Sequence, residues 1–321
     1  MTDTLHSWGP GNVTSLLSTT MENRDIKDIQ DGVFNDLVLI KHLIDKNSVR
    51  RSGGASILVP IRSSKNTTAG FYDGFGTIDT TPQDELTTAQ FDWKQAAVAV
   101  SVSGREERIQ NSGMYAALDL VESKIKGAQD SLKDKINTAL YATSPAATEL
   151  GSLVTSIDET STIGDINSTT YSFWQASSTT SGSFAAQGLS DMRSLWAELE
   201  VRAPAAPTDL ILTTSTVYNY YEAALQAQQR YTSSERTGNA SFDTLKFRSA
   251  PVRYDAACTS GVAYFLNSQA MELCIHSGTD FIMKDWVSPA NQDAKVALFM
   301  VGLELVIKNR RKLGKMISIT A

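Results

Sequence analysis

The longest patterned segment of the chain, residues 105–142, limits the fold more than any other feature. Apolar side chains recur there at spacings of three and four, which place them in one stripe along a helix. At 1.5 Å per residue the helix would be about 50 Å long. Strand-like segments on both sides argue against a coiled coil, so we expect a long helix laid across a sheet in an α+β fold. The stripe consists of Met114, Leu118, Val121, Ile125, Ala128, Leu132, Ile136 and Ala139.

Two predicted strands, 56–62 and 91–103, precede this helix and flank a long polar tip that contains several glycines. They predict a protruding hairpin, and an isolated two-stranded hairpin is at best marginally stable in water. Phe71, Tyr72 and Phe75 lie near the tip. We expect these side chains to anchor the hairpin on a neighbouring subunit. The alternative is a hairpin that folds back on its own domain.

The remaining elements are predicted from shorter patterns. Residues 1–30 are polar and indicate a loose N-terminal arm, and Ser215 is the expected N-cap of a later helix. The last two strands predict a second hairpin, with its charges at the bend 309–312. The other expected segments are a helix from Val33 to Ile44, loops over 143–188, a helix over 189–202, a strand at 210–213, a helix over 215–231, strands within 244–255 and 261–267, and the final strands 294–308 and 314–319.

Composition excludes several classes of protein. The chain has 321 residues, 41% of them hydrophobic and 20% charged, which suits one large or two smaller globular domains. A net charge of -6 argues against a uniformly basic nucleic-acid face. We find no signal peptide and no apolar run long enough to span a membrane, so we expect a soluble protein made in a cytoplasm. Cys258 and Cys274 are too far apart for a metal knuckle or a redox pair and are expected to be free and buried.

The sequence offers little catalytic chemistry. The three histidines, His6, His42 and His276, are scattered, and no nucleotide, metal or hydrolase motif occurs. We therefore expect no catalytic residue, no cofactor and no metal. The adjacent carboxylates at 84–85 and 158–159 leave a hydrolase as the alternative from another class, although sequence adjacency does not supply the separation that a glycosidase needs.

Four arginines are candidates for ion pairs or for contacts with a genome. Arg105 and Arg108 stand beside two glutamates at the start of the long helix, where an ion-pair network competes with DNA contact. Arg310 and Arg311 lie in the bend of the predicted C-terminal hairpin. Such a bend is ordinarily solvated, and its alternatives are phosphate or the acidic side chains of a neighbour.

The order of these segments resembles that of a tailed-bacteriophage major capsid protein with the Hong Kong 97-like fold. Four phrases carry the resemblance, over roughly residues 33 to 321. They are GDINSTTYSFWQ at 164–175, DLILTTSTVYNYYEAAL at 209–225, LKFRSAPVRYD at 245–255 and GLELVIKNRRKLGKMISI at 302–319. Only about thirty residues precede the first helix, which points to a separate scaffolding protein or none.

The resemblance implies a shell-building subunit and not an enzyme. It implies pentamers and hexamers of a capsid, with scaffolding, portal and decoration proteins as partners, weak contact with packaged DNA, assembly in the host cytoplasm and residence in the virion. Lys65, near the hairpin tip, would be the candidate for a cross-link between subunits. An encapsulin-like cage and a tail-tube or baseplate protein are the alternatives. The implied parts are an N-terminal arm 1–32, an N-terminal helix 33–52, an E-loop hairpin 53–103, a peripheral domain 104–185 with 271–321 around the spine helix, and an axial domain 186–270.

Overall fold

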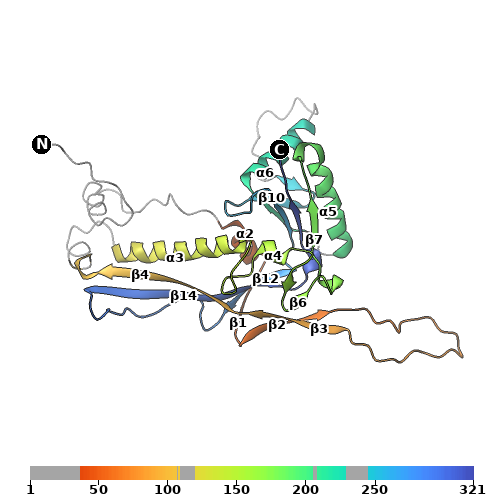
Figure 1. Ribbon diagram of the computed structural model, residues 1–321, viewed down its shortest axis with the longest axis horizontal. Helices are drawn as coiled ribbons and strands as arrows, with labels where there is room; N and C mark the ends of the chain where they lie inside the picture. Colours follow the sequence, from red (N-terminus) through yellow and green to blue (C-terminus); the bar gives the residue numbers. More distant parts are fainter. Residues whose placement is uncertain (1–36, 107, 109–119, 205–207, 229–244) are drawn as a thin grey trace. The chain divides into compact units, whose positions relative to one another are not determined.

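The computed structural model describes residues 37–106, 108, 120–204, 208–228 and 245–321 (Figure 1). These residues form two compact units. The first is built from Ala97–Asp134 and Phe281–Met300, and the second from Asp36–Ala96, Lys135–Asp280 and Val301–Ala321. The predicted arm 1–32 and the stripe residues Met114 and Leu118 lie outside the described residues.

The first unit consists of paired β-strands with one helix packed beside them. Strand β14 (Ala294–Ile307) pairs with β4 (Lys94–Ser103) and with the short β13 (Ile282–Met283). Helix α3 (Leu120–Leu140) runs beside β4 and β14 (Figure 1). The valines that alternate along the end of β4 are buried at Val100 and Val102. Lys124 of α3 fixes the contact by donating to the Ser101 carbonyl at 3.2 Å.

In the second unit, the C-terminal half of β14 belongs to the same five-stranded sheet. There it pairs antiparallel with β12 (Met271–His276), and β12 pairs parallel with β1 (Val49–Ser52). Helix α2 (Val38–Asp45) precedes this sheet and buries Leu39 and Leu43. The predicted N-terminal helix 33–52 is therefore too long at its C-terminal end, because residues 49–52 are a strand.

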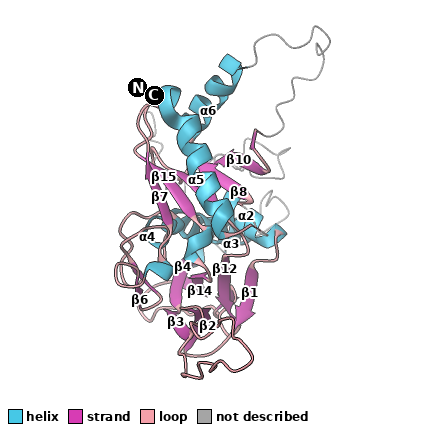
Figure 2. Ribbon diagram, turned by 90° about the vertical axis from the view of Figure 1, so that its right-hand side faces the viewer, coloured by secondary structure: helices cyan, strands magenta, loops and turns pink. Residues whose placement is uncertain are grey.

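A six-stranded sheet forms the rest of the second unit, in the order β7-β15-β11-β8-β10-β9. Helix α5 (Leu189–Arg202) crosses one face of this sheet (Figure 2), and α6 (Ser215–Gln228) contributes Val217 and Tyr221 to the same core. The central strands β8 and β11 are buried along their whole length and are apolar except for Thr213, as expected for strands covered on both faces. The strands are β7 (Ser177–Thr180), β15 (Gly314–Ile317), β11 (Ala263–Leu266), β8 (Leu210–Thr213), β10 (Ala250–Tyr254) and β9 (Lys246–Phe247).

Two small hairpins and several single turns complete the second unit. Strands β2 (Ser56–Arg62) and β3 (Leu86–Asp92) form one hairpin, and β5 (Thr162–Ile163) and β6 (Ile166–Asn167) form the other. The remaining elements are α4 (Leu153–Ser156), the 3-10 turns η2 (Ser172–Trp174) and η4 (Arg310–Lys312), and the π-helical turn η3 (Phe184–Gly188).

Three predictions about local structure are corrected. The partner of β2 is Leu86–Asp92, and most of the predicted strand 91–103 is β4, which pairs with β14 instead. Thr214, and not Ser215, stands before α6 and accepts from the Val217 amide at 3.5 Å. The predicted C-terminal hairpin is wrong, because β14 and β15 belong to different sheets.

Other predictions are confirmed. The helix over 189–202 and the strand at 210–213 have the expected bounds. The strand–turn–strand at 244–255 is β9 and β10, which are joined by a turn with Arg248 at φ 51°. On α3, Leu132 and Ile136 of the predicted stripe are buried.

Candidate self-assembly site

The root of the β2–β3 hairpin is an ordered antiparallel ladder with two different faces. Seven pairs run from Ser56 opposite Asp92 to Arg62 opposite Leu86. One face buries Ile57, Ala89 and Phe91. Leu58 and Leu86 lie on the opposite face and are exposed. The alternation of side chains along a strand therefore gives the root an attached face and an outer face on which Leu58 and Leu86 are exposed.

The attached face rests on the turn between β5 and β6. Gly164 in this turn accepts a hydrogen bond from the Gln90 amide at 3.1 Å. Its φ of +61° lies in the left-handed region, and an added Cβ would come within 2.8 Å of the Ala89 Cβ. Only glycine fits both demands. The alternative that the hairpin folds onto its own domain thus holds for the root.

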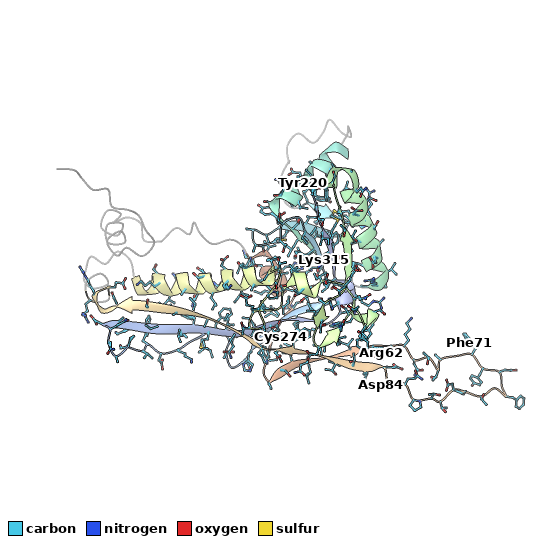
Figure 3. All side chains as sticks on the ribbon, in the orientation of Figure 1. Arg62, Phe71, Asp84, Tyr220, Cys274 and Lys315 are labelled. Carbon is cyan, nitrogen blue, oxygen red and sulfur yellow. The ribbon has the colours of Figure 1, made fainter. Side chains whose placement is uncertain are left out.

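Beyond the root, residues 63–85 form an extended loop that has no strand. Short polar contacts tie its two arms, such as the Ser63 amide to the Glu85 carbonyl at 2.8 Å and Thr67 Oγ1 to Gln83 Oε1 at 3.0 Å. In Figure 3, Phe71 lies on this loop farther out than Arg62 and Asp84, which are at its base. The loop is therefore held at its neck by its own hydrogen bonds.

The aromatic side chains predicted to make contacts are all exposed on this loop. Phe71 and Phe75 have relative exposures of 111% and 105%, and Tyr72 and Ile78 are also open to solvent. Lys65 is exposed on the same loop. Large apolar side chains gathered at an exposed tip are typical of a protein–protein contact. We call Phe71, Tyr72, Phe75 and Ile78 the tip residues.

A second group of exposed apolar side chains, which the sequence did not predict, lies in the first unit. Ile282 on β13 and Leu298 on β14 are partly exposed, as are Phe281 and Val287. Ile282 stands opposite Met300, and Val287 bridges to Val296. The alternation along β14 could have suggested Leu298, but the pairing that adds Ile282 and Val287 is not local.

The start of the predicted long helix contains an ion-pair network, as one interpretation of the sequence proposed. Glu106 accepts from Lys124 Nζ at 2.8 Å and from the Ser103 amide at 2.9 Å. Burial acts to raise the pKa of Glu106, but these donors hold it below its usual value. Arg108 pairs with Asp293, whereas Arg105 is exposed.

Arg310 corrects another prediction, because its side chain is completely buried and faces neither solvent nor a genome. Its guanidinium donates to the carbonyls of Ser156, Asp158 and Ser161 at 2.9, 2.6 and 3.1 Å. Burial lowers the pKa of Arg310 to about 10. This buried anchor turns the chain away from β14 and explains why the predicted hairpin does not form. Arg311 remains exposed.

The loop carboxylates do not form an acid–base pair. Asp158 accepts from Lys315 Nζ at 3.1 Å and from Thr160 Oγ1 at 2.9 Å. Burial acts to raise the pKa of Asp158, yet these two hydrogen bonds lower it overall. A carboxylate held ionised by a lysine is typical of a structural contact. Asp84 contributes its backbone carbonyl to the neck of the loop.

In the described part of the chain, no group of three or more histidine, cysteine or acidic side chains could hold a metal ion. Within those same ranges, no helix is long and apolar enough to cross a membrane. Cys258 and Cys274 are free and buried, as predicted. Burial raises the pKa of Cys258 to about 12, which makes its thiol unreactive.

No sequence-defined protein family and no curated protein sequence matches this chain. Solved structures do. A chain of the cyanophage A-1(L) capsid asymmetric unit has a TM-score of 0.71 at 15% identity, over 93% of this chain and 97% of that one. A chain from the capsid of a native GTA particle has a TM-score of 0.65 at 8% identity, over 91% and 94%.

The SrpI encapsulin of Synechococcus elongatus PCC 7942 has a TM-score of 0.58 at 9% identity, over 98% of this chain and 96% of that one. At these identities the likeness establishes a shared fold. The coverage shows that the fold is shared over nearly the whole length of each chain.

Proposed function

We propose that this chain, which has the α+β fold of tailed-phage capsid subunits, is a major capsid protein that self-assembles into a closed icosahedral shell around double-stranded DNA. The observation that carries the proposal is the exposed aromatic tip. Phe71 and Phe75 have no cover within their own unit, and burial of a phenylalanine is worth roughly 1.5–3 kcal/mol. Shells built from many copies of one chain would supply that cover repeatedly.

The proposed partners are further copies of the chain, arranged as pentamers and hexamers. Interfaces of obligate assemblies bury thousands of square ångströms. The outer face of the hairpin root and the exposed group around Ile282 and Leu298 would add to the area that the tip residues provide. Closed shells follow when such contacts repeat around symmetry axes.

We assign the parts of a capsid subunit to this chain as part of the same proposal. Residues 53–103 would contain the E-loop, and the described part of α3 would be the spine helix. The peripheral domain would comprise 104–185 and 271–321. The axial domain would comprise 186–270, which contains α5, α6 and strands β8, β9, β10 and β11 of the six-stranded sheet, whereas β7 and β15 of that sheet fall within the ranges of the peripheral domain. Scaffolding, portal and decoration proteins would be the other partners.

Contact with packaged DNA would be weak. The formal charge of -6 offers no basic lining, and electrostatic attraction to phosphate dominates non-specific DNA binding. Of the four arginines considered, Arg105 and Arg311 are the exposed ones left without an assigned contact. The proposed location is the virion, after assembly in the host cytoplasm, and the proposed role is structural and not enzymatic.

The first test is negative-stain electron microscopy of the expressed chain. Closed shells are expected, whereas tubes would indicate a tail-tube protein and would contradict the proposal. The likeness to the SrpI encapsulin makes a cellular cage the second candidate. Particles purified from infected or induced cells should contain DNA that resists nuclease. Particles that contain a protein cargo and no protected DNA would favour the cage.

The second test targets the tip. Replacing Phe71, Tyr72 and Phe75 together with serine is expected to reduce shell yield at least tenfold, because the tip loses its apolar contact area. The subunit should keep its circular dichroism spectrum, since none of the three is buried. The matched control exchanges the same residues conservatively, as Phe71→Tyr, Tyr72→Phe and Phe75→Tyr. An undiminished yield of shells from the serine variant would contradict the role of the tip.

A further inference from the structure

The connection between the β2–β3 hairpin and the five-stranded sheet of β14 contains a buried carboxyl group that the proposed function does not use. Glu304 on β14 has a relative exposure of 4%. Its Oε1 accepts from the Gly151 and Leu305 amides, each at 3.1 Å. Its Oε2 is buried and has no hydrogen-bond partner. A buried, half-satisfied carboxylate is costly and needs an explanation.

The side chains that act on Glu304 lie at the junction itself. Burial raises the pKa of Glu304 to about 7. The Gly151 amide, Lys94 and the Leu305 amide lower it in part, and Asp92 raises it. Asp92 ends β3 and Lys94 begins β4, so Trp93 between them is the point where the hairpin leaves the sheet. The charged neighbours of Glu304 are therefore the two residues on either side of this connection.

The indole ring of Trp93 links the connection between β3 and β4 to the turn before β2 and to β12. Trp93 Nε1 donates to the Gly54 carbonyl at 2.9 Å, in the turn before β2. The Trp93 ring also meets the His276 ring edge-on, with centroids 5.0 Å apart. His276 Nδ1 accepts from the Gly278 amide at 3.1 Å, which holds the imidazole in this position. The two ends of the hairpin are therefore joined by the hydrogen bond between Trp93 and Gly54. Gly54 has a φ of +114°.

From β12, the residue opposite Glu304 in register is Cys274. Burial raises the pKa of this thiol, so it provides no charge to Glu304 near neutral pH. Glu272, two residues before it, is already paired with Lys308 at 2.9 Å and with Arg50 at 3.7 Å. Among the described residues, Lys94 is the cation whose charge lowers the pKa of Glu304.

We propose that residues 53–54 and 92–94 form a pH-sensitive hinge for the β2–β3 hairpin, and that Glu304 is its titrating group. In acid, neutral Glu304 stays buried and the junction is closed. In base, the ionised carboxylate needs a hydrogen-bond donor for Oε2. Lys94 or water then moves toward Oε2, and this movement loosens the connection at Trp93. The hairpin is then freer to change direction relative to the sheet that holds Glu304.

The test is hydrogen exchange of the full-length, unassembled chain between pH 5.5 and 8.5, corrected for the intrinsic pH dependence of amide exchange. Amides of β2 and β3 should exchange faster at pH 8 than at pH 5.5, by about thirtyfold, because the carboxyl group of the open state is already ionised in most molecules at pH 5.5. Glu304→Gln, which mimics the neutral acid, should abolish this step. Glu272→Gln on the neighbouring strand is the matched control and should retain it.

Substitutions at Asp92, which is exposed, and at Lys94, which is half-buried, keep the test independent of any folding defect at Glu304. Lys94→Met should move the midpoint of the step to higher pH, because the carboxylate loses its cation. Asp92→Asn should move the midpoint to lower pH, because a repelling charge is removed. His276→Gln should leave the midpoint in place. Exchange that shows no step in the wild type, or a step that survives Glu304→Gln and disappears in His276→Gln, would overturn the proposal.

Discussion

Arg310 illustrates how one side chain can decide the path of the backbone. Its guanidinium satisfies three carbonyls of the segment 156–161, and that segment is far from it in sequence. A polar group buried without its partner costs 1–3 kcal/mol, and breaking a buried charged contact costs more. The sequence run around Arg310 and Arg311 contains no sign that the first is buried and the second exposed.

Arg310→Met is expected to destabilise the unassembled subunit by about 3 kcal/mol, because it leaves those carbonyls without donors. Urea unfolding followed by circular dichroism measures the change. Arg311→Met is the matched control and should stay within about 0.5 kcal/mol of the wild type. Equal stabilities for the two variants would show that the buried contacts of Arg310 contribute nothing.

Glu304 predicts how stability depends on pH. Its folded pKa of about 7 exceeds the unfolded value, so the folded state holds the extra proton between these two values. Stability from this group is therefore complete at acid pH, falls as pH rises through about 7, and then levels off. The total loss should be on the order of 3 kcal/mol, of which about 2 kcal/mol falls between pH 5.5 and 8. Urea midpoints at pH 5.5 and 8 should differ less in Glu304→Gln, and an unchanged difference would reject this assignment.

Among the elements, the β5–β6 turn is what attaches the hairpin to its own unit. Gly164→Ala places a Cβ within 2.8 Å of the Ala89 Cβ and also forces a positive φ on alanine. We expect a loss of about 1–3 kcal/mol, with faster exchange of β3 amides. Gly182→Ala is the control, because an added Cβ there meets nothing within 4 Å. Equal stability of the two variants would contradict the assignment of this turn as the support of the hairpin root.

Elements with a local pattern could be predicted from sequence, and elements defined by distant partners could not. The apolar residues of α5 repeat at helical spacing, and Leu210–Thr213 is a short apolar run before a helix. The strand predicted to pair with β2 starts at residue 91, whereas β3 starts at Leu86. The polar residues Thr87, Thr88 and Gln90 obscure the alternation of Ala89 and Phe91. The separation of β14 from β15 depends on pairing with β12 and β11, which no local pattern contains.

At the scale of the whole molecule, the exposed loop 63–85 should change its accessibility on assembly. Chymotrypsin is expected to cut the free subunit after Phe71, Tyr72 or Phe75, because these residues lie on an extended, exposed loop. In assembled shells the same bonds should be cut at least about tenfold more slowly, since cleavage requires an open segment. Mass spectrometry of the fragments identifies the bonds. Cleavage at an equal rate in shells would mean that no neighbour covers the tip.

Part of the candidate site could be predicted from the sequence. Phe71, Tyr72 and Phe75 stand out because aromatic residues are unusual in a polar, glycine-containing loop. Glu304 does not stand out, because an acid within the run LELVI gives no indication that a backbone amide from Gly151 meets it. The second exposed group was missed for the same reason, since Ile282 and Val287 join Leu298 only through strand pairing.

The strand order of the six-stranded sheet has a consequence for synthesis. Strand β15 is formed by residues 314–317 and lies between β7 and β11, whose residues are translated much earlier. Until 314–317 emerge from the ribosome, those two strands lack their common partner and the sheet is left in two pieces. A chain that stops short of this strand would leave the facing edges of β7 and β11 unpaired, so premature termination upstream of residue 314 should leave the sheet incomplete.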